Sequence, residues 1–192
     1  MREAAELTVP ELTPGARRIL DVASELFYRR GIHAVGVDTI AAESGITKRT
    51  LYDRFGSKDH LVAAYLQARH ASWWARLQER LAAAPPPRAL AVFDAYVDDA
   101  VATDRGCAFL NAAGELPSDH SAQDVVRAHK RAVRRLLADL VAQDCPDLAD
   151  AAAVADEVFL LLEGAIAHRG IDDGDALMSR AREAAERLLA PR

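Results

Sequence analysis

The sequence is poor in cysteine and contains no long apolar run. Only two of its 192 residues are cysteines, Cys107 and Cys145, and they lie far apart with no partner at metal-site spacing. We therefore expect two free thiols in a reducing compartment. A membrane-spanning helix needs roughly 18–20 consecutive apolar residues, and the first six residues lack the basic-then-apolar order of a signal peptide. These absences predict a cytoplasmic protein with no membrane partner.

Signals for β-strands are also scarce. β-branched runs are short and strict polar–apolar alternation never persists, whereas apolar residues recur at helical spacing along the chain. Alanine, the strongest helix former, is abundant. A hydrophobic content of 51% supplies enough material for a packed core. Together these features predict an all-α fold.

The net charge of −5 counts against nucleic-acid binding only if it is spread evenly. Residues 14–60 carry eight Lys and Arg against six Asp and Glu, whereas residues 61–192 carry 15 against 20. Where the positive charge lies matters more than the total. The distribution favours a DNA-binding N-terminal segment attached to an acidic remainder.

Capping and breaking residues divide the chain into about nine helices. Thr13-Pro14 starts the first helix, Gly31 ends it, and the proline triplet 85–87 stops a long helix that Ser57 begins. We predict two domains, a three-helix domain at 13–60 and a second helical domain at 61–192. The expected helices cover 14–30, 37–44, 48–54, 57–83, 88–103, 107–116, a segment beginning after Ser121, 149–169 and 174–189.

The stretch from Thr39 to Lys58 has the spacing of a helix-turn-helix. Ala41 is small where a second helix crosses closely, Gly45 supplies the turn, and Leu51 is a buried contact that fixes the crossing angle. Lysine and arginine reach guanine edges or phosphates, and hydroxyl groups bind phosphates or base edges. The predicted DNA-binding residues are Thr39, Thr47, Lys48, Arg49, Thr50 and Tyr52, with Lys58 as a phosphate clamp at the start of the next helix.

Residues 14–65 resemble the DNA-binding domain of the TetR/AcrR family of transcriptional regulators. Two positions depart from the family pattern, Ser44 in place of alanine and Gly36 in place of a capping Ser or Thr. The specific portion is T-L-Y-x-x-F-x-S-K. The matching residues are Ile19-Leu20, Ala23, Leu26-Phe27, Gly31, Ile40-Ala41, the run from Gly45 to Tyr52, Phe55, and the run from Ser57 to Leu61.

The resemblance implies an effector-responsive regulator, expected to be a repressor, that binds a palindromic operator as a homodimer. In this family the last two helices of each subunit form an intersubunit four-helix bundle. A small molecule bound among the central helices shifts the long fourth helix, and the recognition helices then miss half-sites about 34–36 Å apart. The implied dimerisation residues are Val158, Leu161, Leu162, Ala165, Leu177, Ala181, Ala184 and Leu188. The implied effector-binding residues are Trp73, Trp74, Phe93, Tyr96, Cys107, Phe109, Asn111, His129, Phe159 and Glu163.

Several alternatives stay open beside this hypothesis. Core packing also explains the aromatic residues, and Cys107 is either a buried thiol or a redox sensor. His120 with nearby aspartates, or His129, could bind a metal, but no spacing demands it. We find no catalytic motif and expect no enzyme activity, cofactor or metal. An adaptor that has lost DNA binding and an activator are the remaining classes, because the sequence does not encode the sign of regulation.

Overall fold

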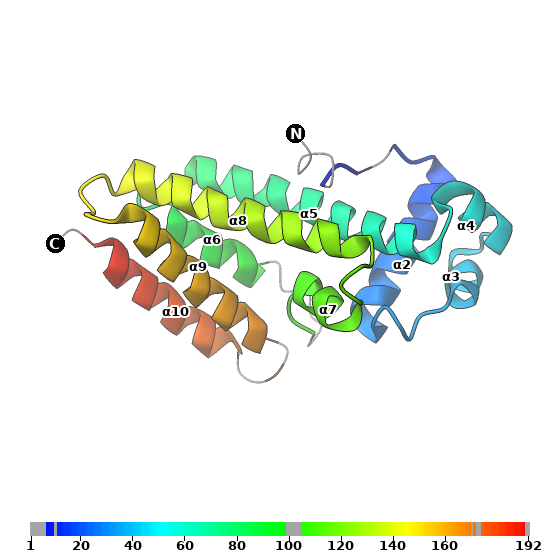
Figure 1. Ribbon diagram of the computed structural model, residues 1–192. Coiled ribbons are helices and arrows are strands. Elements are labelled where there is room, and N and C mark those ends of the chain that lie inside the picture. The colour runs from blue at the N-terminus through cyan, green and yellow to red at the C-terminus, as the bar shows by residue number, and fades with distance from the viewer. Residues whose placement is uncertain (1–6, 10, 99–104, 170, 172–173, 191–192) are drawn as a thin grey trace. The chain divides into compact units, whose positions relative to one another are not determined.

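The computed structural model describes residues 7–9, 11–98, 105–169, 171 and 174–190, and this part of the chain is all-helical, with nine helices and no strand (Figure 1). No helix in these ranges combines the length and the hydropathy needed to cross a membrane. The helices are α2 (Pro14–Arg30), α3 (Val37–Ser44), α4 (Lys48–Phe55), α5 (Lys58–Ala83), α6 (Ala89–Asp98), α7 (Ala108–Glu115), α8 (Ala122–Asp144), α9 (Ala151–His168) and α10 (Gly174–Leu189). The all-α prediction is confirmed.

The ends of the first helices follow their capping residues. The Thr13 hydroxyl accepts a hydrogen bond from the backbone N–H of Ala16, and Pro14 occupies the first helical position. Gly31 ends α2 with a φ of 91°, a conformation that favours glycine. Gly36 provides no side-chain cap for α3, as its sequence position predicted.

The chain forms two compact units that interleave along the sequence. The first unit contains the described residues up to Ser72 together with Ala108–His129, and the second contains those of Trp73–Cys107 and of Lys130–Arg192. The expected helix at 88–103 is described only from Ala89 to Asp98, and residues 99–104 lie outside the described part. Because α7 and the first turns of α8 belong to the first unit, that unit contains more than the helix-turn-helix.

In the first unit, α2 packs on both α3 and α4. Ile19 and Leu20 of α2, Ile40 of α3 and Leu51 of α4 are fully buried between these helices. Burial of each large aliphatic side chain contributes roughly 1.5–3 kcal/mol. Two eight-residue helices are too short to be stable alone in water, so this shared core fixes their orientation.

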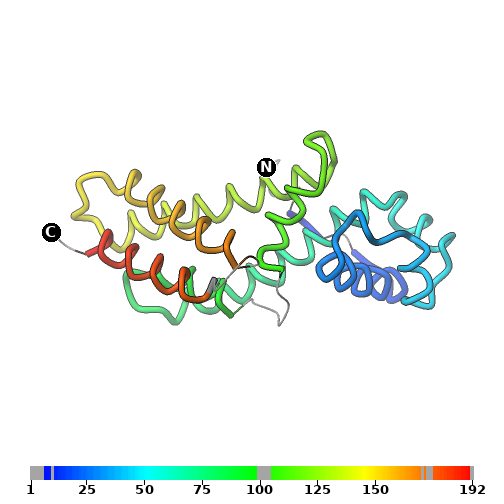
Figure 2. Tube along the Cα trace, turned by 90° about the horizontal axis from the view of Figure 1, so that it is seen from below, coloured from blue at the N-terminus to red at the C-terminus, as the bar shows by residue number. Residues whose placement is uncertain are grey.

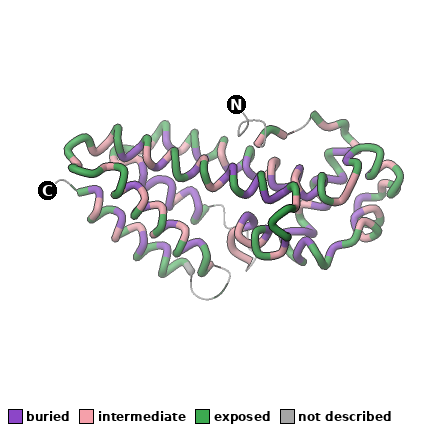
Figure 3. The backbone as a smooth tube through the Cα atoms, in the orientation of Figure 1, coloured by how far each residue is buried: buried purple, intermediate pink, exposed green. Residues whose placement is uncertain are grey.

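In the second unit, α9 and α10 lie side by side over much of their length, and α10 also packs on α6 (Figure 2). Phe93 of α6, Leu162 of α9 and Met178 of α10 are almost completely buried. Buried and exposed residues alternate along these helices at helical spacing (Figure 3). One face of each helix therefore builds the core and the other faces outward.

An ion pair ties the segment before α6 to the end of α8. Asp144 accepts hydrogen bonds from the backbone N–H of Arg88 at 2.7 Å and from its guanidinium at 2.7–3.2 Å. The Asp144 side chain is only 6% exposed. The side-chain hydrogen bond from Arg88 lowers the pKa of Asp144 below its ordinary value. The carboxylate thus fixes the chain directly after the proline triplet.

We predict that Asp144→Asn lowers the melting temperature by about 2–4 °C at pH 7. The pKa of Asp144 is lowered in the folded state, so its stabilising effect is complete above the ordinary pKa of about 3.9 and is lost as the pH falls through the folded value. Thermal unfolding of both proteins between pH 3 and 7 tests this. Asp139→Asn, an α8 control, should show no such difference, and a gap between wild type and Asp144→Asn that stays constant down to pH 3 contradicts the prediction.

Candidate DNA-binding surface and effector-binding residues

The turn between α3 and α4 is tight and internally hydrogen-bonded. Gly45 adopts the left-handed conformation with a φ of 68°, and its N–H bonds the last carbonyls of α3. Ser44 is 1% exposed, and its hydroxyl accepts from the Ile46 N–H and donates to the Ala41 carbonyl, each at 3.3 Å. Arg18 of α2 donates its Nε–H to the Ser44 carbonyl at 2.5 Å. The hydroxyl explains why serine fits a position where the family pattern has alanine.

Thr47 caps α4, as its position in the sequence predicted. Its hydroxyl oxygen accepts a hydrogen bond from the Thr50 backbone N–H at 3.2 Å and lies 3.0 Å from the Thr50 hydroxyl. The Thr47 and Thr50 hydroxyls therefore contact each other. Each also has a lone pair or a proton left for a phosphate.

Three predicted DNA-binding residues form an exposed polar face on α4. The Arg49 side chain is 91% exposed, with Asp53 3.9 Å away, and Tyr52 is 45% exposed. Lys48 forms an exposed ion pair with Asp38 of α3. Such surface pairs contribute little to stability, so both cations can exchange their carboxylate for another anion. Thr39, in contrast, is half-buried on α3.

Lys58 has a partner inside the first unit. Its ammonium donates to the Ile32 carbonyl at 2.7 Å and lies 5.9 Å from the centre of the Phe27 ring. Burial lowers the pKa of Lys58, while the carboxylates of Asp59 and Glu115 oppose that shift. This lysine therefore anchors the loop after α2. A contact with a DNA phosphate would use an N–H of the ammonium group that is not bonded to the Ile32 carbonyl.

In the first unit, Phe109 of α7 contacts one of two buried histidines, and these two histidines contact each other. The Phe109 ring stacks on His129 of α8, with ring centres 3.7 Å apart and planes at 6°. His129 Nδ1 lies 2.9 Å from Nδ1 of His70 on α5, so one of these nitrogens donates and the other accepts. Burial lowers the pKa of His70 below its ordinary value. Asn111 is half-buried on the same helix as Phe109. His70 was missed from the sequence because its partner is 59 residues away.

In the second unit, Trp73 lies between aromatic neighbours. Its ring centre is 4.6 Å from that of Tyr96 and 6.1 Å from that of Trp74. Phe93 is completely buried, which makes it a core residue of this unit, and Phe159 is half-buried on α9.

Glu163 and Cys107 share a cation that the sequence analysis missed. The Lys130 ammonium donates to both Glu163 carboxylate oxygens, at 2.7 and 2.9 Å, and lies 3.9 Å from the Cys107 sulfur. Both charged side chains are less than one-fifth exposed. Lys130 and Glu163 are 33 residues apart, so no local pattern revealed the pair. Both cysteines have free thiols, and burial raises the pKa of Cys145.

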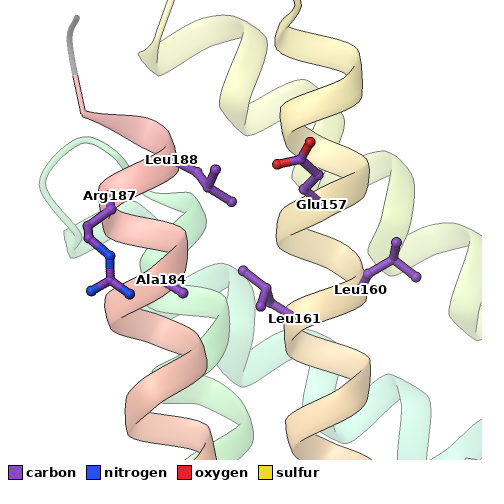
Figure 4. Close-up of a pocket in the computed structure, with 6 residues that line it drawn as sticks. All are labelled: Glu157, Leu160, Leu161, Ala184, Arg187 and Leu188. Carbon is purple, nitrogen blue, oxygen red and sulfur yellow. The ribbon is translucent and has the colours of Figure 1, made fainter.

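The predicted dimerisation residues fall into two groups. The first group is buried within the chain itself and stabilises its own core: Val158, Leu162, Ala165 and Ala181. The second group faces outward, with Leu177 exposed and the others bordering a groove of about 560 Å³ on α9 and α10 (Figure 4). Leu160, which is 68% exposed, also belongs to the groove. Its lining residues are Glu157, Leu160, Leu161, Ala184, Arg187 and Leu188.

Within the described ranges, no cluster of three or more His, Cys, Asp or Glu side chains could hold a metal ion. His120 instead lies 3.3 Å from Asp59 and accepts the backbone N–H of Ala122 at its Nδ1. The ring thus has two protein partners, and the metal site considered for it has no support in the geometry.

An N-terminal helix-turn-helix with an exposed, partly cationic second helix defines a DNA-binding regulator. The sequence model described as "Bacterial regulatory proteins, tetR family" matches residues 19–65, and the one described as "Tetracyclin repressor-like, C-terminal domain" matches residues 85–185. The chain belongs to the TetR family of bacterial transcriptional regulators. Neither of these two models describes an enzyme family.

Solved structures share this fold along most of the chain. A TetR-family transcriptional regulator from Streptomyces coelicolor is 31% identical, with a TM-score of 0.82, over 91% of this chain and 94% of the other. A transcriptional regulator from Saccharomonospora viridis, solved in complex with choline, is 19% identical, with a TM-score of 0.78, over 88% and 94%.

A curated relative matches only a short stretch of this chain. The HTH-type transcriptional activator FasR of Mycolicibacterium smegmatis is 49% identical over 50 residues, which are 26% of this chain and 23% of that protein. This chain therefore matches less than a quarter of the length of that relative.

We predict that Ser44→Ala destabilises the protein by about 0.5–1.5 kcal/mol, because it removes a buried hydroxyl that both accepts and donates in the turn. Denaturant unfolding measures the change. Ser24→Ala is the matched control, because the Ser24 hydroxyl only bonds the Leu20 carbonyl one helical turn back. Equal stabilities for the two alanine variants would show that the Ser44 hydroxyl does not hold the turn.

Proposed function

We propose that this TetR-family regulator is a homodimeric repressor that binds a palindromic operator and is released by a small-molecule effector. The observation that carries the proposal is the exposed face of α4, where Arg49 and Tyr52 extend into solvent beside a rigid turn. An α-helix fits the major groove of DNA, and an arginine there bonds guanine O6 and N7 with two hydrogen bonds. We assign base reading to Arg49 on this ground.

The remaining polar residues suit contacts with phosphates. Lys48, Thr47 and Thr50 lie at the N-terminal end of α4, where the helix dipole also favours an anion. Thr39 and Lys58 are less exposed and are assigned supporting phosphate contacts. Phosphate contacts fix the position of a protein on the duplex, and base contacts supply its sequence preference.

The proposed occupant of the groove on α9 and α10 is a second copy of this chain. A two-fold axis would bring the outward leucines of both copies together and exclude them from water. Glu157 lies on α9 and Arg187 on α10, at the edges of that apolar strip, so the axis could also oppose the two charges across the interface (Figure 4). A dimer would present two recognition helices to one palindrome.

The effector is proposed to bind near the buried aromatic and polar residues of the central helices. Two sets of candidates support this, Phe109, Asn111 and His129 in the first unit and Trp73, Tyr96, Cys107 and Glu163 in the second. The choline complex of the S. viridis protein supports a small ligand in this fold, but it does not identify the ligand of this chain. Release requires an effector that binds the DNA-incompetent form more tightly.

The sign of regulation has a second candidate, because FasR, which is 49% identical to this chain over 50 residues, is named an activator. A promoter carrying the operator in front of a reporter gene distinguishes the two. Reporter output that falls when the protein is expressed supports repression, and output that rises makes the protein an activator.

We expect purified protein to select a palindromic sequence from random duplexes, and Arg49→Ala to lose about 1–3 kcal/mol of binding free energy and its preference at one base pair per half-site. Tyr52→Ala should also weaken binding. Arg29→Ala is the charge-matched control, because Arg29 is an exposed α2 residue paired with Glu25. Failure of the folded dimer to select any sequence contradicts the proposal, unless extraction recovers a bound small molecule whose removal restores binding.

We predict that Leu160→Glu converts the dimer into a monomer, because it places a charge on each side of the proposed two-fold interface. Sedimentation measures the mass, and the operator affinity should fall with it. Ala75→Glu adds the same charge at an exposed α5 position outside the groove and should leave the mass unchanged. A Leu160→Glu protein that keeps the wild-type mass would exclude this surface as the interface.

A further inference from the structure

The last residue of α7 holds the loop that follows α2. One carboxylate oxygen of Glu115 accepts hydrogen bonds from the backbone N–H groups of Ile32 at 2.6 Å and His33 at 3.1 Å. His33 in return donates its Nε2–H to the Glu115 carbonyl at 2.5 Å. Three hydrogen bonds thus join two residues of the loop to one residue that is 83 positions away from Ile32 in the chain.

The backbone N–H and the carbonyl of Ile32 are each hydrogen-bonded to a charged side chain, and the two side chains have opposite charges. Its N–H is bound by the Glu115 carboxylate, and its carbonyl accepts from the Lys58 ammonium at 2.7 Å. The Ile32 side chain is buried. The residue therefore cannot move away from Glu115 without leaving a backbone N–H unsatisfied beside a buried side chain, which is costly.

The rest of α7 is held just as firmly. Phe109, in its first turn, stacks on His129, which contacts His70. At the other end, the Gln123 side-chain amide donates to the carbonyls of Ala113 and Leu116 at 3.3 and 2.9 Å. Phe109 and Glu115 are six residues apart, or about 9 Å along a helix. One short rigid element thus carries a proposed effector contact at one end and the loop contact at the other.

We propose that Glu115 is a positioning residue that transmits the position of α7 to the helix-turn-helix. The inference rests on the proposed function, since it deepens the route from effector to DNA. A displacement of α7 at Phe109 moves the Glu115 carboxylate with it. Backbone N–H···O hydrogen bonds have donor–acceptor distances of about 2.7–3.2 Å, so the loop at 32–33 must follow such a displacement or lose its acceptor. That loop leads directly into α3, which sets the direction of α4.

The first test needs no DNA. Amide hydrogen exchange of the full-length protein, followed by NMR, should show Ile32 and His33 exchanging about tenfold faster in Glu115→Ala. Glu115→Gln keeps an acceptor oxygen without the charge and should restore part of the protection. Glu25→Ala removes the same charge from an exposed α2 position and should change nothing at these two amides. Unchanged exchange in folded Glu115→Ala overturns the proposal.

The second test uses the selected operator and variants with two base pairs added to or removed from its centre. Glu115→Ala should lose about tenfold in affinity for the native spacing, or about 1.4 kcal/mol, and should discriminate less between spacings, because the helix-turn-helix is less firmly oriented. Binding to a single half-site should not change. Equal loss on half-sites and on every spacing would make Glu115 a general stabilising residue and overturn the proposal. Wild-type protein that binds no operator contradicts the proposed function instead, and leaves the exchange test to decide the role of Glu115.

Discussion

The orientation of the proposed DNA-binding helix α4 depends on one left-handed turn at Gly45. Because α4 has only eight residues, it cannot hold a direction by itself and takes its orientation from the turn and from Leu51 in the core. The Ser44 hydroxyl and the Arg18 guanidinium satisfy the polar groups that the turn exposes. A different angle at this point would redirect Arg49 and Tyr52 together. The turn therefore sets which groups a DNA duplex can meet.

The acidic residues beside the proposed DNA-binding cations have a physical consequence for specificity. Asp38 pairs with Lys48 and Asp53 lies near Arg49, so neither cation faces DNA as an isolated positive charge. Affinity for any DNA sequence grows with the number of phosphates neutralised, and nearby carboxylates oppose that term. Base contacts are affected less, because they depend on hydrogen-bond geometry as well as on charge. The modest positive balance of residues 14–60, eight Lys and Arg against six Asp and Glu, thus suits a regulator that must bind most DNA sequences weakly.

The sequence predicted local features well and distant contacts poorly. Thr13-Pro14, Gly31 and Gly45 marked helix ends correctly because their effects act within one turn of helix. The partners of Glu115, His70 and Lys130 were not predictable, because each lies at least 23 residues away and only folding brings it close. The apolar pattern of α9 could not separate Leu162, which is buried in its own chain, from Leu160, which faces outward. Helix periodicity identifies an apolar face, but it does not tell whether that face packs within its own chain or against another chain.

In the proposed mechanism, the short helix α7 couples effector binding to DNA binding. Eight residues do not form a stable helix alone, so α7 depends on its tertiary contacts, which include those at both of its ends. A ligand that moves Phe109 must act against the stacking on His129 and the hydrogen bonds from Glu115 to the loop. The coupling also acts from DNA to ligand, because DNA that favours one position of the loop also favours one position of α7. Coupling between two binding sites is reciprocal by necessity. An effector that weakens DNA binding must therefore bind less tightly to the DNA-bound protein, and the proposed role of Glu115 places this residue on the route between the two proposed sites.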